Sequence, residues 1–119
     1  MMNNIKVSPH FSLQEVSCRC GCNYAVIDCE LINKLEALRA IFNKPINVSS
    51  WCRCLQYNKS VGGVSNSQHL TGKAADIVIK GISPSRVAEA ALKVGFKGVG
   101  IYKTFTHVDV RKISATWEG

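Results

Sequence analysis

The sequence predicts an α+β protein in which helices pack with a small, mainly antiparallel sheet. Apolar residues recur at helical spacing in two long segments, and short apolar or alternating segments typical of strands lie between and after them. Of the 119 residues, 46% are hydrophobic and 19% are charged, which is typical of one compact domain. We therefore expect one domain over residues 1–119, in the order helix, strand, strand, helix, strand, strand.

The first half contains the clearest helix. Ser12 and Glu15 have the spacing of a capping box and predict a short helix near residues 11–15. Asp28 is a candidate N-cap for a helix over residues 28–42. The apolar residues of that helix recur at helical spacing: Leu31, Ile32, Leu35, Leu38, Ile41 and Phe42. Asn43, Lys44 and Pro45 end it, and residues 46–49 alternate as a strand does.

The second half supplies three further strands and a helix. A loop or short helix is expected over residues 53–59 and a flexible turn over 62–67. Residues 74–79 form an apolar strand that only Asp76 interrupts. Ser83 and Pro84 begin a helix through residue 94, which Gly95 ends. Strands over residues 98–102 and 106–110 complete the sheet.

Charge and hydropathy narrow the possible partners. The formal net charge of +7 favours a polyanion: nucleic acid, anionic lipid, or the teichoic acid and carboxylates of a bacterial wall. Nucleic acid is not expected, because no binding motif is present and few aromatic residues lie among the basic ones. No apolar run is long enough for a membrane span, and residues 1–16 lack the apolar core of a signal peptide. We expect synthesis in the bacterial cytoplasm without a signal peptide.

The six cysteines allow three interpretations. Cys18, Cys20 and Cys22 would point the same way on an extended strand and could present three sulfurs to a soft metal. Their spacing differs from the paired CxxC of common structural zinc sites. Reduced structural thiols, disulfides that also involve Cys29, Cys52 or Cys54, and a second metal site all remain open.

Three side chains are chemically reactive or charged at positions where the local pattern predicts an ordinary turn or strand residue. His69 follows a glycine-rich turn, Asp76 interrupts an apolar strand, and His107 lies on a late strand. Two imidazoles and one carboxylate suit zinc and leave a fourth ligand position open. The alternative is that Asp76 is a turn or capping acid and that the histidines are ordinary polar residues.

The residues around these three strengthen the metal hypothesis. Residues 67–76 read SQHLTGKAAD, which resembles the SxHxxGxAxD signature of the zinc D-alanyl-D-alanine carboxypeptidase family. Residues 107–111, HVDVR, resemble its late HxD strand, and the likeness extends to 50–53, 57–58, 61–63 and the cysteine-rich start seen in phage-type members. The resemblance implies the Hedgehog/DD-peptidase fold and a single zinc peptidase-like domain.

The resemblance also implies roles for individual residues. Zinc would be held by His69, Asp76 and His107. The guanidinium of Arg53 would face the scissile carbonyl of the substrate, although it could instead be a surface charge between two cysteines. Ser67 is a candidate to bind substrate or orient a ligand, and Tyr102 is a candidate to line the pocket.

The general base departs from the family pattern. The position three residues before the last zinc histidine commonly carries an acid or a histidine, and here it is Thr104. Asp109 lies two residues after His107 on the same strand face. It could serve as the base, hold His107 in place, or be a purely structural acid paired with Arg111.

The function that these residues predict is zinc-dependent hydrolysis of an amide bond in peptidoglycan stem peptides. The chain would act at the anionic cell wall as a carboxypeptidase or endopeptidase, as a monomer, and would be encoded by a phage or prophage. The alternative is a non-catalytic wall-binding or virion structural module that keeps the peptidase fold, which Thr104 favours.

Overall fold

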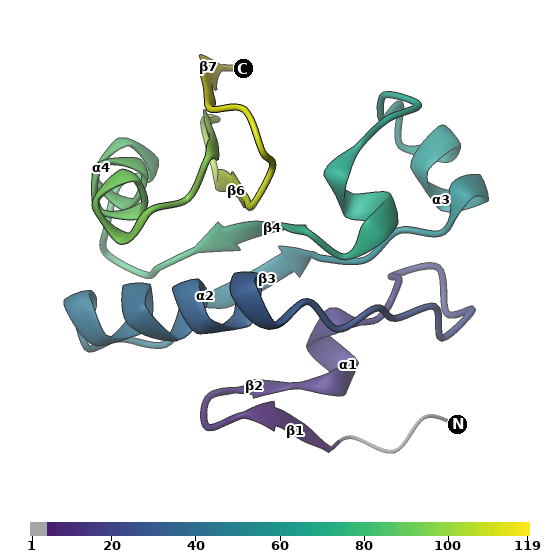
Figure 1. The fold of residues 1–119 in the computed structure, drawn as a ribbon, viewed down its shortest axis with the longest axis horizontal. Coiled ribbons are helices and arrows are strands. Elements are labelled where there is room, and N and C mark those ends of the chain that lie inside the picture. The colour runs from purple at the N-terminus through teal and green to yellow at the C-terminus, as the bar shows by residue number, and fades with distance from the viewer. Residues whose placement is uncertain (1–4) are drawn as a thin grey trace.

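Two sheets and four α-helices make up the computed structural model, which describes residues 5–119 (Figure 1). The larger sheet has the order β3-β4-β6-β5-β7, formed by Asn47–Ser50, Ala74–Val78, Thr106–Asp109, Gly98–Ile101 and Ala115–Glu118. Its β3-β4, β4-β6 and β6-β5 pairings are antiparallel, and its β5-β7 pairing is parallel. The predicted α+β class and mainly antiparallel sheet are confirmed. Residues 1–4 of the predicted domain lie outside the described residues.

The long helices begin and end where their capping residues predict. Helix α2 (Cys29–Phe42) starts at Asp28, whose side chain accepts a hydrogen bond from the Leu31 amide at 2.9 Å. Helix α4 (Pro84–Val94) starts at Ser83 and ends at Gly95, which adopts the left-handed backbone conformation with φ 109°.

The short helices belong to the segments that surround the sheet. They are α1 (Leu13–Val16), α3 (Leu55–Ser60) and the 3-10 helix η1 (Gln68–Thr71). The predicted capping box of Ser12 and Glu15 is present at the start of α1. Of the loop or short helix expected over residues 53–59, the structure has the short helix, α3.

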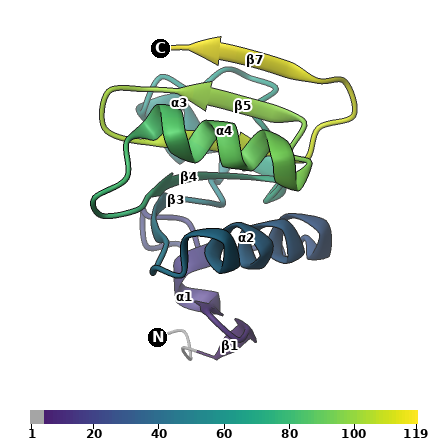
Figure 2. The same ribbon diagram turned by 90° about the vertical axis from the view of Figure 1, so that its left-hand side faces the viewer.

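Strand alternation sends apolar side chains to the face that the long helices cover. Figure 2 shows α4 in front of β5, with α2 below it and beneath β3. Ala75 and Ile77 of β4, Val99 of β5 and Val108 of β6 are buried in the same hydrophobic core as the apolar residues of both helices. The N-terminal segment joins this core through Phe11, whose ring packs edge-on against Trp51 at a centroid distance of 5.9 Å.

The opposite face of the sheet carries one row of register-matched residues. The row crosses all five strands in the order Ser50, Asp76, His107, Gly100 and Trp117. Asp76 and His107 are direct partners on adjacent antiparallel strands, so their side chains lie on the same face. The fold thus brings together two residues that lie far apart in the sequence.

Four elements were not predicted. They are the small antiparallel pair β1 (Lys6–Ser8) and β2 (Phe11–Ser12), the helix η1, and the edge strand β7. Strands β1 and β2 have only three and two residues, η1 is a single 3-10 turn, and β7 is an edge strand in which every second residue is exposed, so none of them has a recognisable apolar pattern. Within residues 5–119, every helix falls short of the length and apolar character needed to cross a membrane.

Candidate metal centre and pocket

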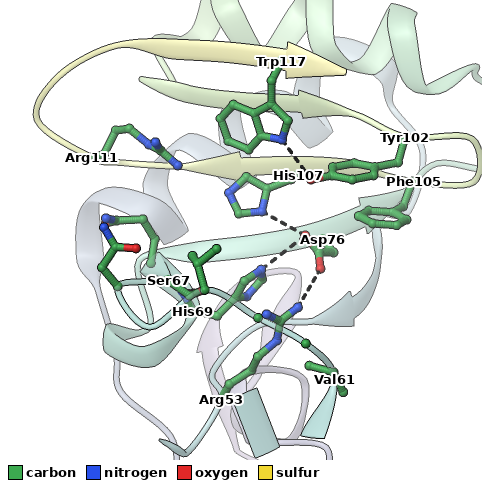
Figure 3. A pocket seen from close by; sticks show the side chains of 15 residues that line it. Arg53, Val61, Ser67, His69, Asp76, Tyr102, Phe105, His107, Arg111 and Trp117 are labelled. Atoms are coloured by element: carbon green, nitrogen blue, oxygen red, sulfur yellow. Dashed lines mark hydrogen bonds and ion pairs between the residues drawn. The ribbon is translucent and has the colours of Figure 1, made fainter. Parts of the chain in front are cut away.

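A pocket of about 630 Å³ lies over the register row (Figure 3). Its walls come from β4, β6 and β7, from the loop after β5, and from the segment that follows β3. His69, Asp76, His107, Arg53, Ser67 and Tyr102 all line it. Six of the seven residues singled out from the sequence therefore face one cavity, and the seventh, Asp109, lies behind it.

His69 is fixed from two sides by the segment after β3. Its Nδ1 lies 2.6 Å from the Trp51 carbonyl oxygen, to which it donates, and the Arg53 amide donates to the His69 carbonyl at 3.0 Å. Ser67 caps η1, because its hydroxyl accepts a hydrogen bond from the His69 amide at 3.2 Å. With the proton on Nδ1, the Nε2 atom of His69 presents a lone pair to the pocket.

The three predicted ligands converge on one point. Asp76 Oδ1 lies 3.3 Å from His69 Nε2 and 3.1 Å from His107 Nδ1, and the donor atoms of all three residues lie within 4.8 Å of one another. His69 Nε2 is buried and makes no hydrogen bond, although a carboxylate oxygen is beside it. Two electron-pair donors that face each other in a buried site call for a cation between them, so these residues fit a zinc ion.

His107 is oriented by a buried carboxylate. Its Nε2 lies 2.7 Å from Asp109 Oδ2, which leaves Nδ1 facing Asp76. Asp109 is fully buried and also receives hydrogen bonds from the Arg111 side chain, at 2.8 Å on Oδ1 and 2.6 Å on Oδ2. Both carboxylate oxygens of Asp109 thus already accept hydrogen bonds. Asp109 contacts His107 at Nε2, the ring nitrogen that does not face Asp76. These contacts favour the orienting role of Asp109 over the general-base role.

Contacts within the site shift the pKa values of Asp76, His107 and Asp109. Burial disfavours ionisation of Asp76, but the hydrogen bond with His107 and the nearby imidazole of His69 outweigh it and hold the pKa of Asp76 well below its ordinary value. Burial likewise opposes protonation of His107, yet the bonds to Asp109 and Asp76 raise the pKa of His107. Burial raises the pKa of Asp109, but the hydrogen bonds from Arg111 and His107 outweigh it and leave that pKa well below its usual range.

Arg53 points into the pocket and is not a free surface charge. Its Nη2 lies 3.4 Å from Asp76 Oδ2, and its side chain is only 15% exposed. Nη1 donates to the side-chain oxygen of Asn58 at 3.2 Å, and Nε donates to the Ser50 hydroxyl at 3.4 Å. Asn58 is buried, so the guanidinium is held in one orientation beside the candidate metal ligands.

The aromatic wall opposite Arg53 was only partly predicted. The rings of Tyr102 and Phe105 stack at 4.5 Å, and the Tyr102 hydroxyl accepts a hydrogen bond from Trp117 Nε1 at 2.8 Å. Trp117 lies 5.2 Å from the His107 ring and under the guanidinium of Arg111 at 4.9 Å. The sequence analysis assigned no role to Trp117, Phe105 or Asn58. The available signal for Trp117 was its position as a large aromatic residue among polar ones near the end of the sequence.

The position expected for a general base carries no acid. Thr104 is exposed and does not line the pocket. Among the pocket residues in the part of the chain that the structure describes, Asp76 is the only carboxylate. The base therefore has no obvious protein candidate at the pocket surface.

Comparison with known proteins assigns the family. The profile of the Peptidase M15 family matches residues 9–110, and the chain belongs to this family. It is 42% identical to the zinc D-Ala-D-Ala carboxypeptidase of Streptomyces albus G over 64 residues, which are 53% of this chain and 25% of that protein. It is 34% identical to the peptidoglycan L,D-endopeptidase MepK of Escherichia coli K12 over 92 residues, 70% of this chain and 50% of MepK.

A third relative gives a similar picture. The chain is 36% identical over 73 residues to the probable peptidoglycan L,D-endopeptidase MepK of Haemophilus influenzae, covering 60% of this chain and 39% of that protein. The chain thus spans a quarter to a half of the length of these curated relatives. The family confirms the resemblance that the SQHLTGKAAD and HVDVR segments predicted.

Proposed function

We propose that this chain is a zinc-dependent peptidase that hydrolyses an amide bond in peptidoglycan stem peptides, with the Hedgehog/DD-peptidase fold. The observation that carries the proposal is the convergence of His69, Asp76 and His107 on one point, with His69 Nε2 buried and unbonded. The relatives named for zinc, D-Ala-D-Ala and peptidoglycan support it.

Each pocket residue has a task in this proposal. His69 Nε2, His107 Nδ1 and an Asp76 carboxylate oxygen would hold zinc, which when bound acts as a Lewis acid toward the scissile carbonyl and the attacking water. Arg53, already oriented by Asn58, would donate hydrogen bonds to the carbonyl oxygen as it gains negative charge. Tyr102, Phe105 and Trp117 would form the wall against which the peptide lies.

Asp109 is proposed as a positioning residue. By accepting a hydrogen bond from Nε2–H of His107, it fixes the tautomer that leaves Nδ1 free to bind metal. Arg111 holds Asp109 ionised, so the two form a support behind the metal ligand. The net charge of +7 would assist binding to an anionic wall.

One observation favours a second candidate, a non-catalytic wall-binding or virion structural module. Thr104 replaces the expected acid, and the pocket residues that the structure describes offer no other carboxylate besides Asp76. Such a protein would keep the fold, the metal and the peptide-binding wall while lacking turnover.

Digestion of purified muropeptides tests the proposal. The zinc-loaded chain is incubated with stem peptides of defined length, and the products are resolved by mass. Loss of a terminal alanine indicates a carboxypeptidase and an internal cut indicates an endopeptidase. His107→Ala should abolish either product, whereas His10→Ala is the matched control, because His10 pairs with Glu36 outside the pocket.

Two results would reject the peptidase. Intact substrates at all enzyme concentrations, together with saturable binding of the same muropeptides, would establish the binding module instead. Equal turnover in the wild type and in His107→Ala would show that the site described here is not the catalytic one.

A further inference from the structure

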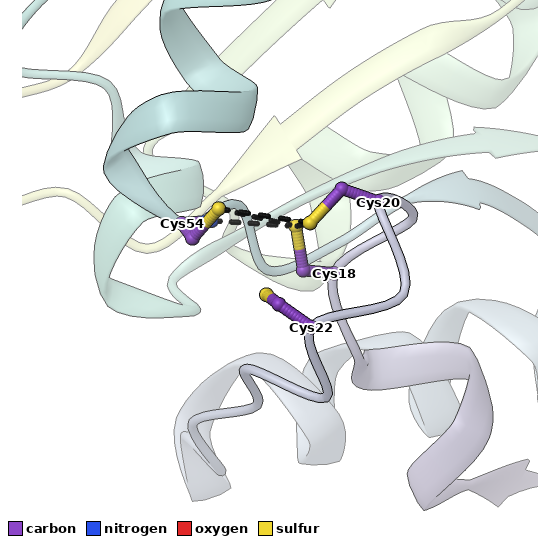
Figure 4. A group of neighbouring side chains, drawn as sticks. All are labelled: Cys18, Cys20, Cys22 and Cys54. Atoms are coloured by element: carbon purple, nitrogen blue, oxygen red, sulfur yellow. Dashed lines mark hydrogen bonds between the residues drawn. The ribbon is translucent and has the colours of Figure 1, made fainter.

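A second group of possible metal ligands lies outside the pocket. The side chains of Cys18, Cys20, Cys22 and Cys54 point toward one another, three from the turn after α1 and one from the residue before α3 (Figure 4). Their sulfur atoms all lie within 4.8 Å of one another. The peptidase proposal makes no use of these four residues.

The sulfur spacing matches tetrahedral coordination. Four sulfurs at about 2.3 Å from a tetrahedrally bound zinc lie about 3.8 Å from one another. The Sγ atom of Cys54 lies 3.8 Å from that of Cys18 and 3.8 Å from that of Cys20, and the Cys18 and Cys20 sulfurs are 3.5 Å apart. We propose that Cys18, Cys20, Cys22 and Cys54 bind a zinc ion as a structural tetrathiolate site, separate from the pocket.

Backbone hydrogen bonds prepare two of the sulfurs to carry negative charge. The Cys54 amide lies 3.4 Å from Cys18 Sγ, and the Tyr57 amide lies 3.4 Å from Cys54 Sγ, in both cases as donor to sulfur. Amide donors of this kind stabilise thiolates, which are the form in which cysteine binds zinc. The other two cysteines are exposed on the same turn and complete the set.

The turn that presents these sulfurs is itself held in place. The Cys18 amide donates to the Tyr24 carbonyl at 2.7 Å and closes the turn, within which Gly21 takes a left-handed conformation with φ 90°. Arg19 donates to the backbone carbonyls of Val48 at 2.9 Å and Ser49 at 3.3 Å. These contacts, which do not involve the sulfurs, hold the loop against β3 and lower the entropic cost of assembling the site.

The remaining two cysteines lie outside the cluster. Cys52 is buried and its sulfur accepts a hydrogen bond from the Val26 amide at 3.1 Å, while Cys29 is exposed at the start of α2. Because only four of the six cysteines lie together, the number of cysteines in the sequence did not reveal this set of four. The sequence-based idea of three sulfurs on one strand face was wrong in its geometry, because the residues form a turn, and it lacked Cys54.

The position of Cys54 gives the site a consequence for the pocket. Cys54 follows Arg53 directly in the chain, so an ion at the cluster would anchor the N-terminal loop to the segment that carries this guanidinium. The inference does not depend on peptidase activity, since it concerns other ligands and another part of the surface.

Metal analysis tests the site without an activity assay. We expect two zinc ions per chain in the wild type, purified under reducing conditions and measured by elemental analysis. The double variant His69→Ala/His107→Ala should keep one, and its X-ray absorption spectrum should show four sulfur neighbours at about 2.3 Å. Cys20→Ser and Cys54→Ser should each lose one ion relative to the wild type, whereas the matched control Cys29→Ser should keep both.

A measurement on the wild type covers the case in which the cysteine variants fail to fold. A mercurial thiol reagent should release one equivalent of zinc, detected by a chelating dye, as the cluster thiols react. The proposal is overturned if the double histidine variant binds no zinc, if it binds iron instead, or if peptide mapping finds these cysteines joined as disulfides in protein purified under reducing conditions.

Discussion

Asp109 Oδ2 lies 2.7 Å from His107 Nε2, while His107 Nδ1 lies 3.1 Å from Asp76 Oδ1. The imidazole is thus held between two carboxylates, the buried Asp109 on the same strand and Asp76 at the pocket. Asp109 is in turn held by Arg111. This chain of contacts supports the positioning role proposed for Asp109 and makes that role testable.

Asp109→Asn should weaken zinc binding at the pocket. It should leave the turnover of the zinc-loaded protein unchanged. The asparagine side chain keeps the shape of aspartate but is uncharged, so it accepts a weaker hydrogen bond from His107 Nε2–H. We therefore expect about a 10- to 100-fold loss of zinc affinity. Peptidase activity should return when zinc is added in excess. A large loss of turnover at saturating zinc would instead identify Asp109 as the general base.

The pKa of His107 should lie above its ordinary value of about 6.5 in the metal-free protein. A group whose pKa is raised on folding stabilises the fold below its unfolded pKa, and this contribution is lost as pH rises through the folded pKa. NMR titration of the ring signals measures the pKa directly, and Asp109→Asn should lower it. An unshifted value in the wild type would contradict the contacts described here.

Arg53→Ala should keep the pocket zinc and reduce turnover by about 10²-fold or more, the scale of losing one oxyanion donor. Arg53 is not one of the converging donor groups, so metal content should not change. The matched control is Arg86→Ala, an exposed arginine on α4 that does not line the pocket. Wild-type rates in Arg53→Ala would show that its orientation by Asn58 has no catalytic purpose.

Two glycines on β5 allow the metal support and the aromatic wall to be disturbed separately. A Cβ on Gly98 would collide with the carboxylate of Asp109, and a Cβ on Gly100 would collide with the indole of Trp117. Each substitution should cost about 1 to 3 kcal/mol of unfolding free energy through overpacking. Gly98→Ala should lower zinc affinity as Asp109→Asn does, and Gly100→Ala should weaken substrate binding with zinc retained. Identical effects of the two changes would mean that the support and the wall are not independent.

The sequence predicted the parts of this molecule that depend on local chemistry. The caps Asp28 and Ser83 placed both long helices, because capping side chains act within three residues of their own position. Asp76 was recognisable because a carboxylate in an apolar strand needs a partner. The structure brings the three proposed ligands, His69, Asp76 and His107, close together.

What the sequence did not predict depends on pairing between distant segments. Strand β7 pairs in parallel with β5, and no local pattern in residues 115–118 specifies that neighbour. The place of Trp117 in the pocket follows from that pairing alone. Likewise, Cys54 joins the N-terminal cysteines only because β3 lies beside the turn that carries them. The spacing of Asp109 left three roles open, namely general base, support for His107 and structural acid, and only its oxygen contacts favour the second of them.

The direct pairing of Asp76 with His107 links metal binding to the accuracy of folding. A shift of β6 by one residue along β4 would turn His107 toward the helices and place an apolar or hydroxyl side chain opposite Asp76. A ligand stabilises only the conformations that bind it. An ion held by these residues would therefore select the correctly paired sheet from its slipped alternatives. In zinc-poor cells, the yield of properly folded chains would then fall together with their activity.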